Sequence, residues 1–290
     1  MTPFRADPYS RGMSDEAAPR PAGRAAVTAL IPTFNEQETL PDCLESVRFC
    51  DEILVVDSFS TDGTLRIARA ARARVLEHEY VNSATQKNWA IPQAMHPWVL
   101  VVDADERVTP ELRQEIEAVL AGEPGKAAFS IPRVNYFLGR EVRHGGWEAD
   151  RVTRLFQRDR CRYEDRQVHA EVRADGPMGA LQSPLLHFTF RSWEQYWPKI
   201  QKYSDWGAMQ AFKDGQRAGR ASILLRPLGR FLKMYVLRLG FLDGTHGAVL
   251  SLLAAFSVYL KYAKLWQLGL DGAAASGARG EAPRRTTPAP

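Results

Sequence analysis

The feature that most constrains the fold is an alternation of short apolar runs with amphipathic stretches between residues 26 and 122. The runs AVTALI, EILVVD and WVLVVD are apolar almost throughout, which is typical of strands buried on both faces of a sheet. The segments around them have helical periodicity: LPDCLESVRFC, TLRIARAARA, ATQKNWAIPQAM and ELRQEIEAVLAG. Strands separated by helices of about ten residues predict an α/β fold with a doubly wound, mostly parallel sheet.

Local signals refine two of these helices. Thr109 followed by Pro110 predicts a helix start, and Gly122 marks its end. Pro92 must kink or shorten the helix ATQKNWAIPQAM, because proline lacks the amide hydrogen that continues a helix.

The second half of the chain has a different character. AAFSIPRVNYFLG and RVTRLFQRD predict further strands, and from Ser192 onward the pattern is helical. Both chain ends are low in complexity, which indicates disorder. We therefore expect a disordered segment over 1–24, an α/β domain over 25–190, a basic helical appendage over 191–268 and a disordered tail over 269–290.

The net charge of the chain is informative once it is divided along the sequence. The total is +4, but residues 25–212 carry a net −5 and residues 213–264 a net +7. A mildly acidic body joined to a basic, apolar region is unlike the binding face of a nucleic-acid-binding protein, so no nucleic-acid partner is expected. The three cysteines form no Cys-x-x-Cys pair, which argues against a structural zinc site and against a disulfide framework.

Polar residues follow three of the predicted strands directly. The first strand leads into Thr33–Glu36, the second ends at Asp57, and the third ends in Asp103-Ala104-Asp105. In an open parallel sheet, ligands bind beyond the carboxyl ends of the strands, so these clusters should meet at one crevice. Two carboxylates at i and i+2 can hold a hard divalent cation that takes phosphate oxygens. Turns and helix caps use the same residue types, and Asp62 before TLRIARAARA fits that simpler role.

These motifs are similar to those of a known family. In order and spacing, VTALIPTFNE, EILVVDSFSTDGT and WVLVVDADE resemble the nucleotide-sugar domain of family 2 glycosyltransferases, which have the GT-A fold. HGGWEADRVTRLFQRD, GPMGALQSPLLHFTFRSWEQY and FLKMYVLRLGFLDG resemble the subgroup that adds glucose to the lipopolysaccharide inner core. The resemblance covers residues 25 to 266 and implies an inverting, metal-dependent transfer of a hexose, such as glucose, from a UDP-sugar to a lipid-anchored glycan.

The resemblance also implies roles for residues in the nucleotide pocket. Thr33, Asn35 and Glu36 would line the pocket after the first strand. Asp57 would accept hydrogen bonds from the uracil ring, with Asp62 in the adjoining loop.

Phosphate and metal contacts are implied in the same way. Lys87 would approach the diphosphate, with Asn88 beside it. Asp103 would contact the ribose or the metal, and Asp105 would be the principal ligand of Mg²⁺ or Mn²⁺. A cation and a lysine there would stabilise the charge that develops on the departing diphosphate. His187 is interpreted more readily as a hydrogen-bonded structural histidine than as a ligand.

The acceptor hydroxyl needs a base, which family members place in an acidic pair downstream of the metal motif. Asp165 in the pair Glu164-Asp165 is the nearest match, with Glu171, Glu164 and Asp150 as alternatives. Relatives have Val-His-Glu after this point, whereas this chain has Val168-His169-Ala170-Glu171, so the usual glutamate is missing or shifted by one. The other interpretation of Glu164 and Asp165 is that they are solvated partners of nearby arginines.

The basic C-terminal region has the composition of an interfacial membrane segment. Seven of its nine cations are interleaved with Leu, Phe, Met and Tyr: Lys213, Arg217, Arg220, Arg226, Arg230, Lys233 and Arg238. The apolar run GAVLSLLAAFSVYL has only 14 residues, so we expect contact with an anionic membrane surface rather than a span. With no signal-peptide pattern at the start, the expected place is the cytoplasmic face of the membrane. A soluble helical cap with a solvated basic face is the alternative.

Three other functions fit parts of the pattern. A polyprenyl phosphate could be the acceptor, although such enzymes often carry membrane spans. VLVVDADERV superficially fits an aspartyl-phosphate phosphatase. In phosphatases, however, the Asp-x-Asp motif lies in the first strand, whereas in this chain two motif-bearing strands come before it. A nucleotide-sugar-binding membrane scaffold is the non-enzyme alternative, and only the altered segment around Ala170 favours it.

Overall fold

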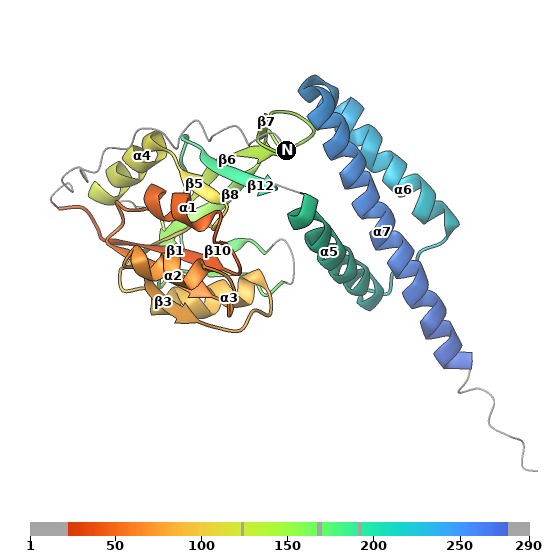
Figure 1. The fold of residues 1–290 in the computed structure, drawn as a ribbon, viewed down its shortest axis with the longest axis horizontal. Helices are drawn as coiled ribbons and strands as arrows, with labels where there is room; N and C mark the ends of the chain where they lie inside the picture. Colours follow the sequence, from red (N-terminus) through yellow and green to blue (C-terminus); the bar gives the residue numbers. More distant parts are fainter. Residues whose placement is uncertain (1–22, 123–124, 167–169, 191–192, 278–290) are drawn as a thin grey trace, which may run out of the picture. The chain divides into compact units, whose positions relative to one another are not determined.

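The computed structural model describes residues 23–122, 125–166, 170–190 and 193–277, and the chain divides into two units between residues 191 and 192. The first unit is an α/β domain and the second is helical (Figure 1). Most of the two predicted disordered tails, 1–24 and 269–290, lies outside the described residues.

Four parallel strands form the first half of the main sheet. They are β1 (Val27–Thr33), β2 (Glu52–Asp57), β3 (Arg74–Glu77) and β4 (Trp98–Val101). Their order is β3-β2-β1-β4, so the chain moves outward from β1 and then returns to the other side of β1. This reversal next to β1 is the position at which doubly wound sheets bind their ligands.

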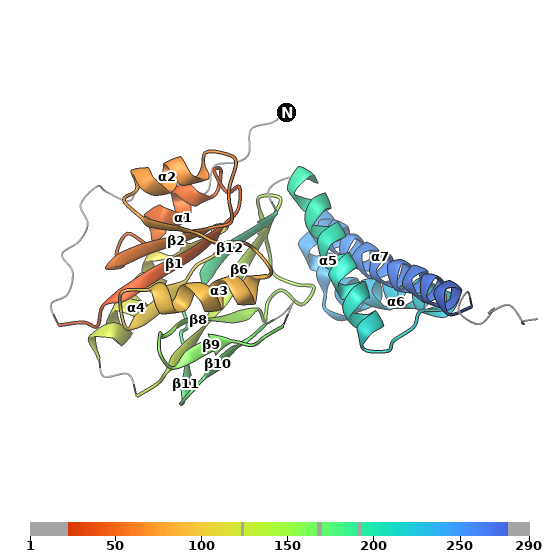
Figure 2. The same cartoon turned by 90° about the horizontal axis from the view of Figure 1, so that it is seen from below.

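Helices cover both faces of the parallel half (Figure 2). α1 (Leu40–Ser46), α2 (Thr64–Ala70) and α4 (Pro110–Ala121) lie on one face, and α3 (Ser83–Ala90) lies on the other. α3 ends two residues before Pro92, in a 3₁₀ turn, so the proline shortens the helix as predicted.

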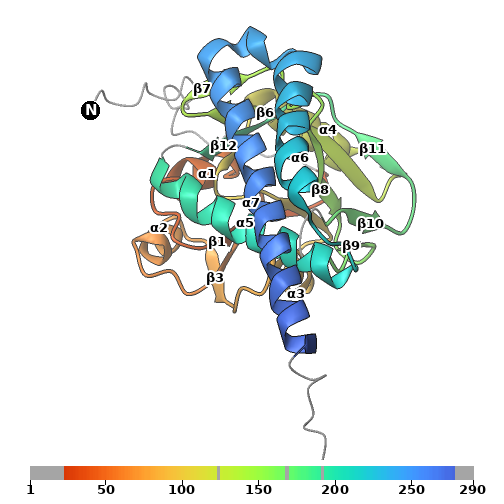
Figure 3. The ribbon, with the colours of Figure 1, turned by 90° about the vertical axis from the view of Figure 1, so that its right-hand side faces the viewer.

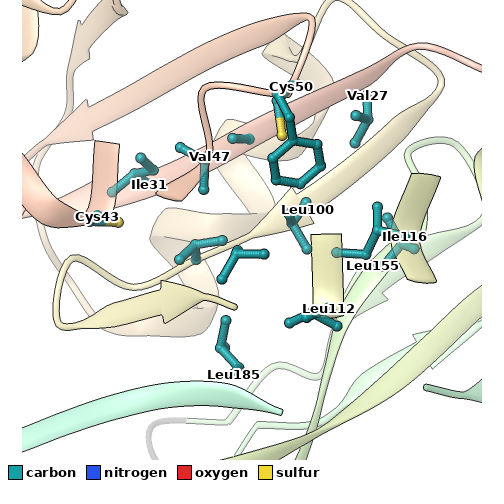
Figure 4. Packing of buried hydrophobic residues seen from close by; sticks show 14 of the residues in the cluster. Val27, Ile31, Cys43, Val47, Cys50, Leu100, Leu112, Ile116, Leu155 and Leu185 are labelled. Carbon is teal, nitrogen blue, oxygen red and sulfur yellow. The ribbon is translucent and has the colours of Figure 1, made fainter. Parts of the chain in front are cut away.

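Alternate residues of β1 enter two different cores. Ile31 belongs to the core that includes Leu112 of α4, part of which is drawn in Figure 4. Its neighbour Leu30 belongs to the core that includes Ala90 of α3. Because side chains alternate along a strand, covering both faces buries every residue of the run AVTALI that lies in β1.

The second half of the sheet is mixed. The remaining strands of the described residues are β5 (Glu106–Val108), β6 (Ala128–Phe137), β7 (Arg140–Val142), β8 (Arg151–Gln157), β9 (Cys161–Tyr163), β10 (Val172–Ala174), β11 (Met178–Ala180) and β12 (Leu185–Phe190). β8 pairs antiparallel with β4, and the order continues through β6 and β12 to β5. β9 and β10 form a separate two-stranded ribbon. The predicted α/β class is confirmed, with antiparallel strands added to its parallel half.

The second unit consists of helices that lie along one another (Figure 3). Its elements are α5 (Trp193–Lys213), α6 (Arg220–Leu232), the π-helical turn η2 (Lys233–Leu237), the 3₁₀ turn η3 (Gly240–Asp243) and α7 (Gly244–Gly277). α7 packs against both α5 and α6. The small core of this unit contains Ala208, Ala211 and Leu265.

The last helix differs from the sequence-based expectation. Lys261 and Lys264 interrupt the apolar sequence after 14 residues. The helix continues past both lysines, and α7 ends at Gly277. The segment Gly240–Asp271 has a mean hydropathy of 1.4 in its most apolar window, and only 17% of that window is buried. By length and composition alone this helix is able to cross a membrane. It also extends into the segment 269–290 that was predicted to be a tail, where alanines favour helix.

Candidate functional site

The loops that follow β1 and β2 are tied to each other by side-chain hydrogen bonds. Asn35 N donates to Ser60 Oγ at 2.8 Å, and Thr61 N donates to Asn35 Oδ1 at 2.8 Å. Further along, Gln37 N donates to Asp62 Oδ2 at 3.2 Å. Each loop thus satisfies the backbone donors of the other.

Asp57 lies at the base of these loops, at the end of β2. Its Oδ1 accepts hydrogen bonds from Thr33 Oγ1 at 2.8 Å and Ser60 Oγ at 2.6 Å, and its Oδ2 accepts from Ser60 N at 2.7 Å. The side chain is completely buried. The structure therefore brings together Thr33 and Asp57, two residues that the resemblance assigns to the nucleotide pocket.

Glu36 and Asp62 lie at the outer end of the same loops. Glu36 N donates to Thr64 Oγ1 at 2.8 Å. Asp62 Oδ1 accepts from Thr64 N at 2.9 Å at the start of α2. Burial raises the pKa of Asp62, but hydrogen bonds from Thr64 and Gln37 outweigh it and lower that pKa. The bond from Thr64 N spans two residues, as in the turn-forming role that the sequence left open for Asp62, whereas the N-cap position of α2 is Gly63.

Two loop residues adopt left-handed backbone conformations. φ is 55° at Asn35 and 60° at Phe59. Asparagine tolerates this region, whereas a bulky residue such as phenylalanine adopts it only when its surroundings require it. The Phe59 side chain is nevertheless 57% exposed, as is that of Phe34. Strained residues of this kind gather at binding sites, so these loops have the features of a ligand-binding surface.

Beyond β4, four charged side chains form a buried network. Lys87 Nζ lies 2.9 Å from Asp103 Oδ1, and Arg154 contacts Asp103 and lies 2.7 Å from Glu106 Oε1. Lys87, Arg154 and Glu106 are all buried. Burial alone would raise the pKa of Asp103, but Arg154 and Lys87 outweigh it and hold that pKa well below its usual range. Asp103 is therefore an ion-paired carboxylate.

Lys87 reaches this network from α3. The Asn82 side chain caps the helix by accepting from Thr85 N at 2.9 Å. The next residue, Asn88, exchanges two hydrogen bonds with the backbone of Tyr163, at 2.9 and 2.8 Å. Asn88 thus fixes α3 against β9 and, with it, the position of Lys87.

The network continues through β6 to β12. Arg133 lies 3.2 Å from Glu106 Oε1 and 2.8 Å from Asp150 Oδ2. Asn135 Nδ2 donates to Asp150 Oδ2 at 3.0 Å, and Asn135 Oδ1 lies 2.7 Å from His187 Nδ1. A continuous series of polar contacts therefore joins the Asp103 cluster to His187.

Asp105 and His187 are the residues best suited to hold a cation. Asp105 Oδ2 lies 3.7 Å from His187 Nε2, a gap that two bonds of about 2.1 Å each can span. The carboxylate of Asp103 is already engaged by Lys87 and Arg154. Within the described ranges, no group of three or more His, Cys, Asp or Glu side chains is arranged to hold a metal. A cation at Asp105 would therefore take further ligands from water or from a bound phosphate.

The predicted base is not in contact with this network. Asp165 is exposed on the segment after β9. Its neighbour Glu164 is ion-paired with Arg173 at 2.9 Å and Arg166 at 3.1 Å, as in the alternative interpretation of the acidic pair. Val168-His169, where the chain departs from its relatives, lies outside the described residues.

Sequence reasoning missed Arg154, Arg133 and Asn135, and it gave His187 a structural role. The available signal was the occurrence of polar side chains inside strand-like apolar segments, as in RVTRLF. A charge inside a buried strand requires a partner, so it indicates a polar network even when the partner cannot be identified.

Comparisons with known proteins agree with these features. The family described as Glycosyl transferase family 2 matches residues 28–175. The lipopolysaccharide core biosynthesis glycosyltransferase LpsC of Rhizobium meliloti (strain 1021) is 30% identical over 261 residues, which are 85% of this chain and 97% of LpsC. The uncharacterized glycosyltransferase RT0209 of Rickettsia typhi is 27% identical over 256 residues, 84% of this chain and 88% of RT0209.

Similarity to solved structures is more limited. Glucosyl-3-phosphoglycerate synthase from Mycobacterium tuberculosis, in complex with Mn²⁺, UDP and phosphoglyceric acid, is 19% identical with a TM-score of 0.36, and the match covers 48% of this chain and 57% of that one. The strand order that reverses at β1, the helices on both faces of the sheet and the polar strand ends agree with the expected GT-A fold. The chain is therefore a glycosyltransferase that belongs to glycosyl transferase family 2.

Proposed function

We propose that this protein transfers a hexose, such as glucose, from a UDP-sugar to a lipid-anchored glycan of the lipopolysaccharide inner-core type, with inversion at the anomeric carbon. The observation that carries the proposal is the arrangement of Lys87 and Arg154 beside the Asp105–His187 pair. Cationic side chains next to two side chains that can bind a metal ion would stabilise the negative charge of a diphosphate leaving group. The acceptor class is supported by the similarity to LpsC, a lipopolysaccharide core glycosyltransferase.

Each residue has a defined part in this proposal. Thr33, Asn35, Glu36, Asp57 and Asp62 form the nucleotide pocket, in which the exposed loop residues meet the nucleotide and the buried Asp57 holds Thr33 and Ser60 in place beneath them. Because these five residues already hydrogen-bond within the protein, the loops are ordered before the donor arrives.

The reacting end of the donor meets the charged network. Asp105 and His187 hold Mg²⁺ or Mn²⁺, and Asp103 orients Lys87 and Arg154. When bound, the cation would neutralise charge on the departing diphosphate. Lys87 binds the same diphosphate from the α3 side, and Asp165 accepts the proton of the attacking hydroxyl. A base of this kind contributes about 10²–10⁴-fold in rate.

A donor and acceptor screen tests the proposal. Purified protein with Mn²⁺ should bind UDP-glucose and release UDP when it is given a membrane lipid extract, and mass spectrometry should find a lipopolysaccharide core heavier by one hexose. If no nucleotide sugar binds at any metal concentration, the proposed function is wrong. UDP-galactose and UDP-N-acetylglucosamine are tested in the same way, for comparison with UDP-glucose as the donor.

A polyprenyl phosphate is the second candidate acceptor, because α7 has the length and composition of a membrane span. Extracted lipopolysaccharide core and polyprenyl phosphate, offered separately with the same donor, distinguish the two. Membership of a glycosyltransferase family removes the support for a phosphatase, whose Asp-x-Asp motif would also have to follow the first strand.

We also propose that the helical unit binds an anionic membrane on its cytoplasmic side. α6 contains no buried residue, and one face of it consists of exposed leucines: Leu224, Leu225, Leu228 and Leu232. On the other side of α6, the exposed Arg226 donates to Tyr262 Oη of α7 at 2.8 Å, so α7 packs away from the leucines and leaves them open. Exposed leucines rimmed by cations are typical of helices that lie in a membrane interface.

Changing the leucine face should release the protein from vesicles. The double variant Leu224→Ser/Leu228→Ser is expected to lower the partition coefficient onto phosphatidylglycerol-containing vesicles by at least about tenfold, because each buried leucine contributes about 1.5–3 kcal/mol. Sedimentation with vesicles measures it, and binding of the wild type should fall with added salt and with pure phosphatidylcholine. The control Val81→Ser/Met95→Ser removes comparably exposed apolar side chains from the α/β domain and should leave partitioning unchanged. Equal partitioning of both double variants would contradict the proposal.

A further inference from the structure

The hydrogen-bonding capacities of Asp150 and Asn135 restrict the state of His187. Asp150 forms an ion pair with Arg133 at 2.8 Å, and a carboxylate in an ion pair only accepts hydrogen bonds. The Asn135 atom that faces Asp150 at 3.0 Å must therefore be the amide nitrogen Nδ2, which donates. The Asn135 amide oxygen is then the atom that faces His187 Nδ1 at 2.7 Å.

An amide oxygen only accepts, so Nδ1 must carry the proton of the neutral His187 imidazole. Thr189 Oγ1, at 3.2 Å from the same nitrogen, can accept from it as well. The other ring nitrogen, Nε2, then has the lone pair, and it lies 3.7 Å from Asp105 Oδ2. A lone pair and a carboxylate oxygen that face each other form half of a cation site.

Strand pairing holds these groups in place. Asn135 of β6 and His187 of β12 are direct partners in the parallel register, and His187 is also the register partner of Glu106 in β5. Asn135 is almost completely buried, so no water competes for its amide group. The orientation of His187 is therefore set by the backbone and by one buried amide.

We propose that Asn135 and Asp150 are positioning residues that hold His187 in its Nδ1–H tautomer and so present Nε2 to a divalent cation at Asp105. This proposal rests on the cation site of the proposed function. It gives Asp150 a role that acts through other side chains, in place of the role of acceptor base that the sequence left open. Neighbours that orient a metal-binding histidine affect metal affinity by about 10–100-fold.

Nitrogen-15 NMR of the metal-free full-length chain at mildly alkaline pH tests the tautomer directly. The chain has six histidines, and the signals of His187 are identified by their loss in His187→Gln. The wild type should show protonated Nδ1 and unprotonated Nε2. In Asp150→Asn, residue 150 can donate as well as accept, so Asn135 is able to turn over, and the two tautomers should mix.

Mn²⁺ binding, measured by the electron paramagnetic resonance of free Mn²⁺, gives the second readout. Asp150→Asn and Asn135→Leu should each weaken binding by about tenfold or more. The matched control is Asp159→Asn, which makes the same chemical change in an acid that is paired with Arg158 at 2.9 Å beyond the opposite end of β8. This control should leave both the tautomer and the Mn²⁺ affinity unchanged.

The outcomes separate the two proposals. A wild-type His187 with a protonated Nε2 overturns the positioning role, and so does an Asp150→Asn protein with the wild-type tautomer and Mn²⁺ affinity. A wild type that binds neither Mn²⁺ nor a UDP-sugar contradicts the proposed function instead, and the NMR measurement then decides on the orientation of His187 alone.

Discussion

Replacing Asp105 with alanine is expected to abolish metal-dependent binding of the UDP-sugar and to lower turnover by at least about a hundredfold. The physical reason is that the carboxylate of Asp103 is engaged by Lys87 and Arg154, so in the proposed cation site the carboxylate comes from Asp105. Calorimetric titration with Mn²⁺ and the UDP-sugar measures binding, and release of UDP measures turnover.

The thermal stability of the variants identifies the cause of this loss. Asp105→Ala should lower the melting temperature less than Asp103→Ala does, because it leaves the buried pairs of Asp103 with Lys87 and Arg154 intact. Asp103→Ala should melt at a lower temperature, because it removes the ion-pair partner of the buried Lys87 and one of the two carboxylates that pair with the buried Arg154. Asp159→Ala, at an exposed acid, controls for the loss of a carboxylate. Metal-dependent binding that survives in Asp105→Ala would place the cation elsewhere.

Arg154→Met is expected to have the largest effect on stability, lowering the free energy of unfolding by about 3–5 kcal/mol near neutral pH. Arg154 is buried and lies between Asp103 and Glu106, so methionine would fill part of the space but leave Asp103 with Lys87 and Glu106 with Arg133 as their remaining counter-charges. Urea unfolding followed by circular dichroism measures the difference. Arg158→Met, which breaks an exposed pair with Asp159, should change stability little.

The same pair of proteins should differ in their response to acid. In the wild type the folded pKa of Asp103 is below its unfolded value of about 3.9, so the stability it contributes is complete above that value and is lost as pH falls through the folded pKa. Without Arg154, Lys87 alone opposes the effect of burial, so the pKa of Asp103 should be higher in the folded variant than in the folded wild type. The difference between the proteins should therefore shrink as pH falls through the folded pKa of Asp103 in the variant. A difference that stays constant with pH would show that lost packing, and not lost charge pairing, destabilises the variant.

Much of the fold was predictable because its signals are local. The apolar runs became β1, β2 and β4. Thr109 caps α4, as the sequence predicted, with Oγ1 accepting from Leu112 N at 3.1 Å. The convergence of Asp57 and Asp103 at one edge of the sheet followed from the parallel order of the strands that carry them.

The rest of the site depends on strand register, which the sequence does not reveal. Arg154 meets Asp103 because β8 pairs with β4, although 51 residues separate them in the chain. His187 faces Asn135 because β12 pairs with β6. The extension of α7 past residue 268 was missed for a different reason: the low complexity of the chain end was taken to indicate disorder, although its alanines favour helix.

The tied loops after β1 and β2 have a thermodynamic consequence. Because Asn35, Gln37 and Asp57 already hold these loops in one conformation, a ligand that binds there loses little affinity to ordering the protein. For the nucleotide binding that we propose, preorganisation of this kind would make discrimination among nucleotides a property of the resting protein rather than of an induced fit. Changes in sugar preference would then be acquired in other segments, and the loops could stay as they are.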